Sequence, residues 1–331
     1  MRIQLLIAVE DLDYTEHLSR VLLDKYQEMF EVSVCSDASR LEALTCERKF
    51  DVLLADHMML SYANLNSVRL PLLLWDVHCE LSQNMTGVER VRKYQRISNL
   101  TGEIIEHYAE IGGKSEPESG RAHVTAVWSP CGGCGKTTVA LAWLKQKVAE
   151  QKKGLYLDLE PFSSIPVYFS QSGKSISSVL EKLDHDVDLL LKSIRMQDHD
   201  SGIYYFGRPD NYDDMSILTQ EEIVALIKTA AKGVDELVVD LGSHYDSKVS
   251  TILDLADTVM LVADQTKASQ IKLEQFCSQH DLYEMISVKS TLVMNRGARS
   301  KAKLNMATVS LPVVQSEDPV HVYKTLSAGY F

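Results

Sequence analysis

Residues 129–138 read SPCGGCGKTT, a stretch whose residue types suit the binding of phosphate groups. An apolar run at 124–128 precedes it and a helix-forming run at 139–147 follows it, so a glycine-rich turn is expected between a strand and a helix. Glycines let backbone N–H groups approach phosphate oxygens, Lys136 adds a mobile positive charge, and the Thr137 hydroxyl can ligate Mg²⁺. The sequence therefore predicts a site for ATP with Mg²⁺. The expected nucleotide contacts in this loop are Gly132, Gly133, Cys134, Gly135, Lys136, Thr137 and Thr138.

Two cysteines of the same loop, Cys131 and Cys134, form a CxxC pattern that out of context is typical of redox or zinc sites. A zinc ion would need further ligands, and no second closely spaced Cys or His pair stands out in the sequence. The six cysteines are scattered over the chain, which favours reduced thiols. Since a helix N-terminus lowers a thiol pKa, some sensitivity of the loop to oxidation is expected.

The chain length and the net charge limit the class of protein that the sequence can encode. A chain of 331 residues is expected to form two domains. Its formal net charge of −12 disfavours DNA binding, and the one candidate basic patch, between residues 296 and 303, is interpreted as a solvated loop. No stretch is long enough to span a bilayer, and the first residues lack the features of a signal peptide. A cytoplasmic protein is expected.

Strand and helix patterns alternate in both halves, which predicts an α/β protein with two doubly wound parallel-sheet domains. The first domain is expected at 1–111, a glycine-, serine- and acid-rich linker at 112–122, and the second domain at 123–331. In the first domain the strands are expected at 3–9, 30–35, 50–55, 70–75 and 88–93, with helices at 14–26, 38–48 and 99–111. In the second domain the strands are expected at 124–128, 154–157, 203–206, 236–239, 259–263 and 291–294, with helices at 175–195 and 219–231.

The loop sequence GGCGKTT resembles the deviant phosphate loop of the ParA/MinD-like ATPases, so the second domain is predicted to be a P-loop NTPase of that type. The general phosphate loop has a glycine where Pro130 stands. The deviant loop has a first lysine that reaches the partner's nucleotide across a dimer, and Cys131 occupies that position. The resemblance thus implies a nucleotide site without this trans contact.

Acidic residues further along the chain extend this resemblance. The segment after residue 157 reads DLEP and is similar to the Asp-x-Asp-Pro switch of the family, which implies that Asp158 lies in the outer shell of the Mg²⁺ ion. Glu160 replaces the aspartate that orients the attacking water, and its extra methylene implies slow hydrolysis. Asp240 follows an apolar strand as a Walker B aspartate does. The expected catalytic residues are Lys136, Asp158, Glu160 and Asp240, and the expected Mg²⁺ ligands, partly through water, are Thr137, Asp158 and Asp240.

Two segments near the C-terminus match the part of the family that contacts the base. Asn295 and Arg296 correspond to the Asn-Arg step that reads adenine, because an amide offers both a donor and an acceptor to a purine edge. Leu311 and Pro312 resemble the segment whose backbone closes over the base.

The first domain resembles a response-regulator receiver domain, which has a flavodoxin-like fold. Glu10 and Asp11 follow the first strand where receivers place Mg²⁺-binding acids, and Asp56 ends the third strand as a candidate phospho-acceptor. The sequence departs from the receiver pattern at residues 75–76, where a Thr or Ser is usual, and at Tyr94, which follows Lys93 in place of proline. Two interpretations stay open: a phosphorylated receiver, or a receiver-shaped docking and dimerisation module.

The order of a receiver-like domain followed by a deviant ParA/MinD-type ATPase resembles the TadZ/CpaE family of tight-adherence (Flp, type IVc) pilus assembly. The resemblance implies an ATP-binding, weakly hydrolysing homodimer that marks the site of the pilus secretion machine. That site is a cell pole or the inner face of the membrane, reached through protein partners. Two alternatives remain: a partition-type ATPase that acts on DNA or another cargo, and a two-component output controlled by phosphorylation of Asp56.

Overall fold

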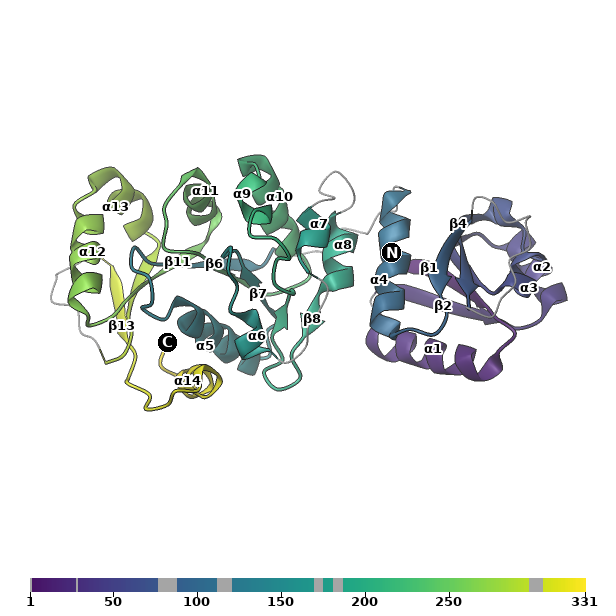
Figure 1. Cartoon of the computed structure of the whole chain (residues 1–331), viewed down its shortest axis with the longest axis horizontal. Helices are drawn as coiled ribbons and strands as arrows, with labels where there is room; N and C mark the ends of the chain where they lie inside the picture. Colours follow the sequence, from purple (N-terminus) through teal and green to yellow (C-terminus); the bar gives the residue numbers. More distant parts are fainter. Residues whose placement is uncertain are drawn as a thin grey trace. The chain divides into compact units, whose positions relative to one another are not determined.

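The computed structural model describes residues 2–27, 29–76, 88–111, 121–169, 175–180, 187–297 and 306–331 (Figure 1). The chain divides into two compact units. Unit 1 comprises Met1–Glu116 together with Asp184–Ser193, and unit 2 comprises Pro117–Leu183 together with Ile194–Phe331. The predicted linker falls almost entirely outside the described residues.

Unit 1 contains a sheet of five parallel strands in the order β2-β1-β3-β4-β5. This is the strand order of the doubly wound flavodoxin-like fold. Strands β1 and β3 are buried at almost every position, as expected for a parallel sheet covered on both faces. The strands are β1 Ile3–Ala8, β2 Phe30–Cys35, β3 Phe50–Ala55, β4 Val68–Trp75 and β5 Glu89–Arg92, and the helices of the first 111 residues are α1 Leu12–Lys25, α2 Ala38–Glu47, α3 His57–Leu60 and α4 Ile97–Glu110.

Aspartate side chains determine where three helices of unit 1 begin. Asp11 accepts a hydrogen bond from Tyr14 N, Asp37 from Arg40 N, and Asp56 from Met59 N, so each is an N-cap. The first helix therefore begins two residues before the predicted start. The short helix α3 and the 3-10 turn at Leu65–Ser67 were not predicted, because four or three residues are too few to show a periodic pattern.

Unit 2 is built on an eight-stranded sheet in the order β13-β12-β11-β6-β10-β7-β9-β8, parallel except for the β8–β9 pair. Five apolar strands fill its centre, and β7 and β10 are buried at every position. Burial on both faces requires helices on both sides. The strands are β6 His123–Trp128, β7 Gly154–Asp158, β8 Met196–Gln197, β9 Tyr204–Tyr205, β10 Glu236–Asp240, β11 Thr258–Ala263, β12 Ser290–Met294 and β13 Ala307–Ser310.

Helices α5 and α14 lie on one side of this sheet, and α10 and α11 lie on the other (Figure 1). Helix α10 begins with the capping box formed by Thr219 and Glu222. The helices that follow residue 121 are α5 Lys136–Ala149, α6 Ile165–Tyr168, α7 Ser177–Leu180, α8 Val187–Ile194, α9 Asp214–Ile217, α10 Gln220–Ala230, α11 Ser247–Leu255, α12 Lys267–Cys277, α13 His280–Ser287 and α14 Pro319–Leu326.

A single helix was predicted over 175–195. The structure has α7 and α8 within this range, and residues 181–186 lie outside the described part of the chain. The strand predicted at 203–206 is confined to the two residues of β9. In the described residues, no helix is both long and apolar enough to cross a membrane.

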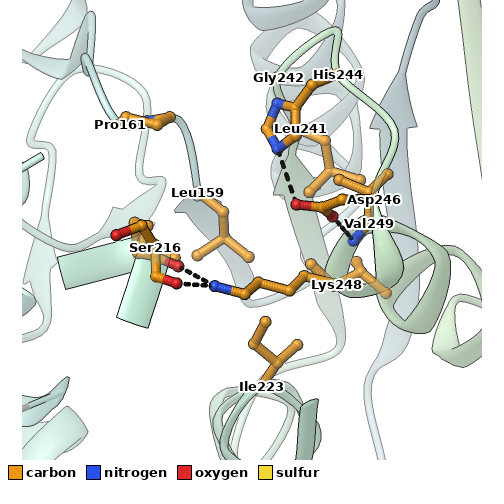
Figure 2. Close-up of a pocket in the computed structure, with 12 residues that line it drawn as sticks. Leu159, Pro161, Ser216, Ile223, Leu241, Gly242, His244, Asp246, Lys248 and Val249 are labelled. Carbon is orange, nitrogen blue, oxygen red and sulfur yellow. Dashed lines mark hydrogen bonds and ion pairs between the residues drawn. The ribbon is translucent and has the colours of Figure 1, made fainter. Parts of the chain in front are cut away.

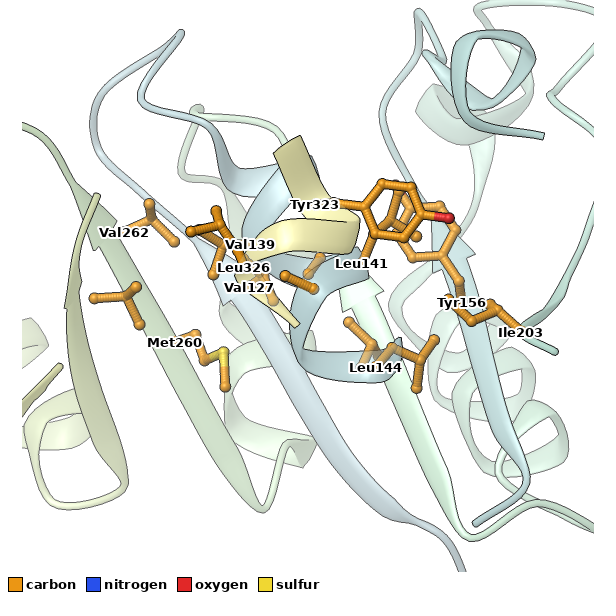
Figure 3. Close-up of a cluster of buried hydrophobic side chains, with 14 of the residues drawn as sticks. Val127, Val139, Leu141, Leu144, Tyr156, Ile203, Met260, Val262, Tyr323 and Leu326 are labelled. Atoms are coloured by element: carbon orange, nitrogen blue, oxygen red, sulfur yellow. The ribbon is translucent and has the colours of Figure 1, made fainter. Parts of the chain in front are cut away.

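The core of unit 2 lies between the sheet and the pair of helices α5 and α14 (Figure 3). Leu141 and Leu144 of α5 are fully buried, and Tyr323 and Leu326 of α14 pack in the same cluster. Gly154 at the start of β7 lies so close to α5 that an added Cβ would be 2.6 Å from a methyl carbon of Leu144. This packing fixes the helix that follows the glycine-rich turn against the strands that carry the acidic residues.

We expect Leu144→Ala to lower the free energy of unfolding of unit 2 by about 2–5 kcal/mol, because the substitution leaves a cavity between α5 and the sheet. Urea titration followed by circular dichroism measures the effect. Val288→Ala is the control, since that side chain is 85% exposed and its loss should change stability by less than about 0.5 kcal/mol. Equal effects of the two substitutions would contradict this description of the core.

Candidate functional site

The glycine-rich turn occupies residues 129–135, between the end of β6 and the start of α5. Gly133 and Gly135 have left-handed backbones, with φ of +75° and +92°. Gly135 is the N-cap of α5 and provides no side-chain hydrogen bond, so the first amides of this helix have no side-chain cap. A turn of this shape at a helix N-terminus presents N–H groups and a positive dipole end to an anion.

Lys136 connects the turn to two other segments. Its side chain is 8% exposed, and its Nζ donates a hydrogen bond to Ser243 Oγ at 3.0 Å. Glu160 Oε1 lies 3.5 Å from the same nitrogen. Glu160 belongs to the segment after β7 and Ser243 to the segment after β10, so one ammonium group contacts both. Ser243 was not predicted as a site residue. The sequence signal that could have indicated it is its position three residues after Asp240.

Asp158 and Asp240 end the neighbouring strands β7 and β10 and are paired in register. Asp158 is 4% exposed and Asp240 is fully buried. Asp158 accepts hydrogen bonds from Glu160 N at 2.9 Å and from Ser163 Oγ at 2.6 Å, and Asp240 Oδ2 accepts one from Tyr156 OH at 2.9 Å. The structure thus brings the two predicted acids together on neighbouring strands, and Asp240 is also paired in register with Val127 near the end of β6.

The electrostatics of this pair are unfavourable without a cation. Burial raises the pKa of Asp240 to about 7, and the neighbouring Asp158 carboxylate adds to that rise. Burial also raises the pKa of Asp158 to about 6, although hydrogen bonds from Ser163 and from the Glu160 backbone oppose this. Two adjacent carboxylates in a buried place favour the neutral forms unless positive charge is nearby.

The hydrogen bonding of this pair bears on whether Mg²⁺ fits the site. Asp240 Oδ1 is buried and has no hydrogen-bond partner. Among the described residues there is no group of three or more His, Cys, Asp or Glu side chains that could hold a metal. The residues therefore suit Mg²⁺ that is held by one or two protein groups, with water and phosphate oxygens as the other ligands. Thr137, Asp158 and Asp240 are the protein groups available for this.

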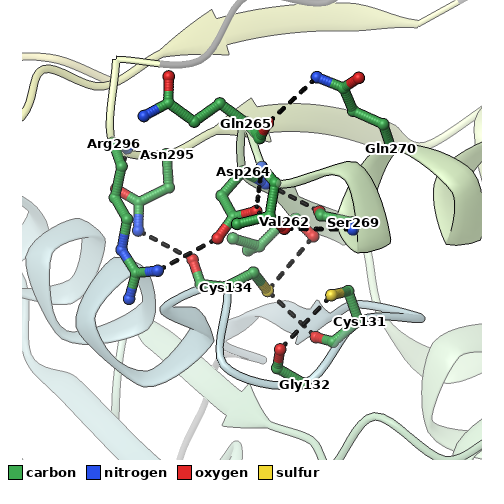
Figure 4. A network of polar contacts seen from close by, with 11 residues as sticks. Cys131, Gly132, Cys134, Val262, Asp264, Gln265, Ser269, Gln270, Asn295 and Arg296 are labelled. Atoms are coloured by element: carbon green, nitrogen blue, oxygen red, sulfur yellow. Dashed lines mark hydrogen bonds and ion pairs between the residues drawn. The ribbon is translucent and has the colours of Figure 1, made fainter.

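The predicted base-contacting residues lie after β12, next to the glycine-rich turn (Figure 4). Asn295 is 5% exposed, and its side-chain amide is bonded to the backbone of Cys134 and of Arg296. The Arg296 guanidinium forms an ion pair with Asp264 at 3.1 Å. Leu311 is fully buried, and its backbone N–H and C=O are bonded to Met294 O and Gly297 N. The other part of the predicted basic patch, residues 299–303, lies outside the described residues.

The two thiols of the turn face the protein interior. Cys134 is fully buried, and its Sγ donates to Cys131 O at 3.2 Å and lies 3.6 Å from Val262 O. Burial raises the pKa of the Cys134 thiol. The expectation that the helix N-terminus lowers a thiol pKa here is wrong for Cys134, because desolvation of the thiolate outweighs it.

An apolar pocket of about 350 Å³ lies beside the segments that follow both acids (Figure 2). Leu159 and Leu241, which directly follow Asp158 and Asp240, form part of its wall. Lys248, one of the residues that line the pocket, donates hydrogen bonds to the carbonyl oxygens of Met215 and Ser216. Its lining residues are Leu159, Pro161, Met215, Ser216, Ile223, Leu241, Gly242, His244, Asp246, Lys248, Val249 and Ile252.

The segment after β10 is also held by Trp128, in addition to the hydrogen bond between Ser243 and Lys136. Trp128, the last residue of β6, donates its indole N–H to His244 O at 3.1 Å. The Trp128 ring also packs edge-on against Tyr245, with ring centroids 5.9 Å apart. The backbone of this segment is therefore bonded to an aromatic side chain that directly precedes the glycine-rich turn.

In unit 1 two of the three acids that were candidates for receiver chemistry, Asp11 and Asp56, serve as helix caps, whereas Glu10 contributes its backbone N–H to Asp56. Asp56 Oδ2 accepts from Glu10 N at 2.8 Å, and its Oδ1 accepts from Met59 N at 2.9 Å. Asp11 caps α1 and forms an ion pair with Lys93 at 3.0 Å. Hydrogen bonds from the Tyr14 backbone and from Lys93 lower the pKa of Asp11. Each of these two aspartates thus has a structural partner within unit 1.

Comparison with solved structures identifies the fold of unit 2. A ParA-family ATPase from Chlorobium tepidum TLS matches with a TM-score of 0.52 and 17% identity, over 62% of this chain and 90% of that one. A plasmid partition protein from Borrelia burgdorferi B31 bound to AMPPNP has a TM-score of 0.47 and 16% identity, over 62% and 97% of the two chains. The septum site-determining protein MinD from Pyrococcus horikoshii OT3, complexed with Mg-ADP, has a TM-score of 0.48 and 14% identity, over 63% and 92%.

The first of these similarities shows that the chain contains a parallel-sheet P-loop domain with the fold of the ParA/MinD-type ATPases. This confirms the predicted fold of the second domain. No protein-family model matches the sequence, and no curated protein has a detectably similar sequence.

The raised pKa of Asp240 predicts how stability depends on pH in Mg²⁺-free protein. Below about pH 4 the group is neutral whether folded or unfolded, and between pH 4 and 7 the unfolded chain releases a proton that the folded chain retains. The free energy of unfolding should therefore fall as pH rises through this range. Asp240→Asn should remove most of the fall and stabilise the protein at pH 8 by on the order of 3 kcal/mol.

Urea titrations between pH 4 and pH 8 in EDTA measure this difference. Asp254→Asn is the matched control, because Asp254 is an exposed carboxylate on α11. A wild-type profile that rises toward pH 8, or one that Asp240→Asn does not alter, would show that Asp240 is not held in its neutral form.

Proposed function

We propose that unit 2 binds ATP with Mg²⁺ and that the bound nucleotide acts mainly as a conformational ligand. The observation that carries this proposal is the position of Lys136. This buried ammonium group lies at the start of α5, within 3.5 Å of Glu160 and 3.0 Å of Ser243, and thus joins the turn to the segments after both acidic strands. A triphosphate bound to the amides of the turn competes for the same ammonium group.

Nucleotide binding at this site would change the contacts of the segments that follow β7 and β10. Lys136 would exchange Glu160 and Ser243 for phosphate oxygens. Thr137, Asp158 and Asp240 would hold Mg²⁺, partly through water, and the ion would supply positive charge to the two aspartates and to the phosphate oxygens. The segments at 159–163 and 241–246 then reorder around the ligand, and the population shifts toward a form that binds partners.

Hydrolysis of ATP is proposed to be slow. Glu160 occupies the place of the residue that would orient the attacking water, and it is paired with Lys136 instead of lying open to solvent. A carboxylate that is about 1 Å from its productive place costs on the order of a hundredfold in rate. The chain is therefore proposed to act through binding, with hydrolysis as the step that resets it.

The test of nucleotide binding is Lys136→Ala. Removal of the ammonium group should abolish ATP binding, whereas Cys131→Ala should leave binding nearly unchanged, because Cys131 Sγ donates to the carbonyl oxygen of the adjacent Gly132. Isothermal titration calorimetry with Mg·ATP measures both variants beside the wild type. Loss of binding in Cys131→Ala would contradict this account of the turn, and absence of heat with the wild type would end the proposal.

We further propose that the chain is a homodimeric localisation or assembly factor for a tight-adherence pilus secretion system. This role rests on the resemblance to the TadZ/CpaE family, in which a receiver-like domain precedes a ParA/MinD-like ATPase. The five-stranded parallel sheet of unit 1 has the 2-1-3-4-5 order that receivers share, which supports the resemblance. A partition-type ATPase acting on DNA is the second candidate, and the net charge of −12 disfavours it.

For unit 1 we propose a docking and dimerisation role that does not require phosphorylation. Both carboxylate oxygens of Asp56 accept backbone hydrogen bonds, and Lys93 is paired with Asp11 instead of Asp56. Incubation with acetyl phosphate and Mg²⁺ should therefore give no gain in intact mass. A gain of one phosphate that Asp56→Asn removes would establish the alternative, a phosphorylation-controlled output. Asp37→Asn, another N-cap in unit 1, is the matched control.

A further inference from the structure

A second pocket of unit 2, with a volume of about 540 Å³, involves the end of the sheet where the parallel strands begin. Glu236 and Thr258, the first residues of β10 and β11, are among the residues that line it. Asp240, which belongs to the proposed nucleotide site, is the last residue of β10. The two sites thus use opposite ends of one strand, and an inference about this pocket does not depend on nucleotide binding.

The carboxylate of Glu236 is hydrogen-bonded through one of its two oxygens. The residue is 2% exposed, and its Oε1 accepts from Thr125 Oγ1 at 2.6 Å and from Trp143 Nε1 at 3.2 Å. Among the described residues, no hydrogen bond reaches Oε2. A buried carboxylate oxygen without a donor is unfavourable. Because Glu236 lines the pocket, a ligand there would supply the missing donor.

Basic side chains lie close to this acid. The indole of Trp143 donates to Glu236, and Lys147 Nζ lies 4.2 Å from the centroid of the same ring system. Lys147 and Lys152 both line the pocket, and their Nζ atoms lie 3.2 and 3.9 Å from one carboxylate, that of Glu150. Two ammonium groups therefore share one counter-charge. An acidic group and an excess of positive charge are thus within reach of one small molecule.

The remaining wall of the pocket is largely apolar. Met260, Val293 and Val309 come from the neighbouring strands β11, β12 and β13. Phe331 packs edge-on against Trp143, with ring centroids 5.6 Å apart. A cavity of this size, with apolar walls and a few polar groups, is typical of small-molecule sites.

We propose that this pocket binds a small zwitterion with an apolar body, the chemical class to which the free apolar and aromatic amino acids belong. The ammonium group of the ligand donates to Glu236 Oε2, and its carboxylate pairs with Lys147. The apolar body packs against the wall formed by the strands. Both polar contacts are charge-assisted hydrogen bonds, which are stronger than neutral ones.

Three probes with the same phenyl ring separate these contacts. L-phenylalanine has both charged groups, phenethylamine lacks the carboxylate, and hydrocinnamate lacks the amine. Ligand-observed NMR titration of the full chain measures each affinity. L-phenylalanine should bind roughly tenfold more tightly than either analogue, because each analogue loses one charge-assisted hydrogen bond. No binding of L-phenylalanine at millimolar concentration, or equal affinity for all three probes, would overturn the proposal.

Two charge variants assign the contacts to residues. Glu236→Gln keeps an oxygen that accepts from Thr125 and Trp143 and replaces the other oxygen by an amide nitrogen. It should weaken L-phenylalanine and phenethylamine by about tenfold and leave hydrocinnamate unchanged. Lys147→Met should weaken L-phenylalanine and hydrocinnamate and leave phenethylamine unchanged. Glu221→Gln, which changes an exposed glutamate on α10, is the matched control. Equal losses for all three probes in both charge variants would contradict the proposed contacts.

Val309→Phe keeps the test decisive if a charge variant is poorly folded. Val309 lies on the edge strand β13, so a larger side chain there fills part of the pocket and leaves both charged groups in place. Binding of L-phenylalanine should be lost, while circular dichroism and urea titration check the fold. Unchanged binding in folded Val309→Phe would place the ligand elsewhere, and the proposal would be wrong.

Discussion

The pair of carboxylates at the ends of β7 and β10 is the constraint on which the site depends. Asp158 and Asp240 are paired in register on neighbouring strands, and Asp240 Oδ1 is one of the buried side-chain oxygens that have no hydrogen-bond partner among the described residues. Burial of adjacent acids is unfavourable unless a cation compensates it. The Lys136 ammonium group is a positive charge near Asp158 in unit 2. In the proposed site, a bound cation would compensate the unfavourable charge of this pair.

Local structure could be predicted where it follows from neighbouring residues. The strand, the glycine-rich turn and helix α5 could be predicted because residues 124–147 show all three signals in order. The acids could be predicted because each follows an apolar strand. What the sequence could not provide is the set of partners brought in from distant segments. Three hydrogen bonds illustrate this: Lys136 donates to Ser243, Tyr156 donates to Asp240, and Asn295 donates to the Cys134 carbonyl oxygen. These contacts depend on strand order and register, which no local pattern encodes.

The same reasoning explains the outcome for unit 1. Alternating strand and helix patterns were sufficient to predict a parallel α/β unit, and the observed sheet order agrees with a doubly wound fold. The chemistry of its acids could not be predicted, because an aspartate after a strand has the same sequence signature whether it binds a cation or caps the next helix. Asp56 and Asp11 are caps in the structure, and the decisive information is that backbone amides reach their carboxylate oxygens.

The hydrogen bond between Trp128 and the backbone of His244 has a practical consequence. The indole is 2% exposed and packs against Tyr245 and Phe276, so its emission depends on a solvent-shielded environment that the segment after β10 helps to form. Movement of that segment would change the polarity around the ring and shift the emission wavelength. The protein therefore carries an intrinsic optical reporter for the rearrangement of this segment, with no need for an attached dye.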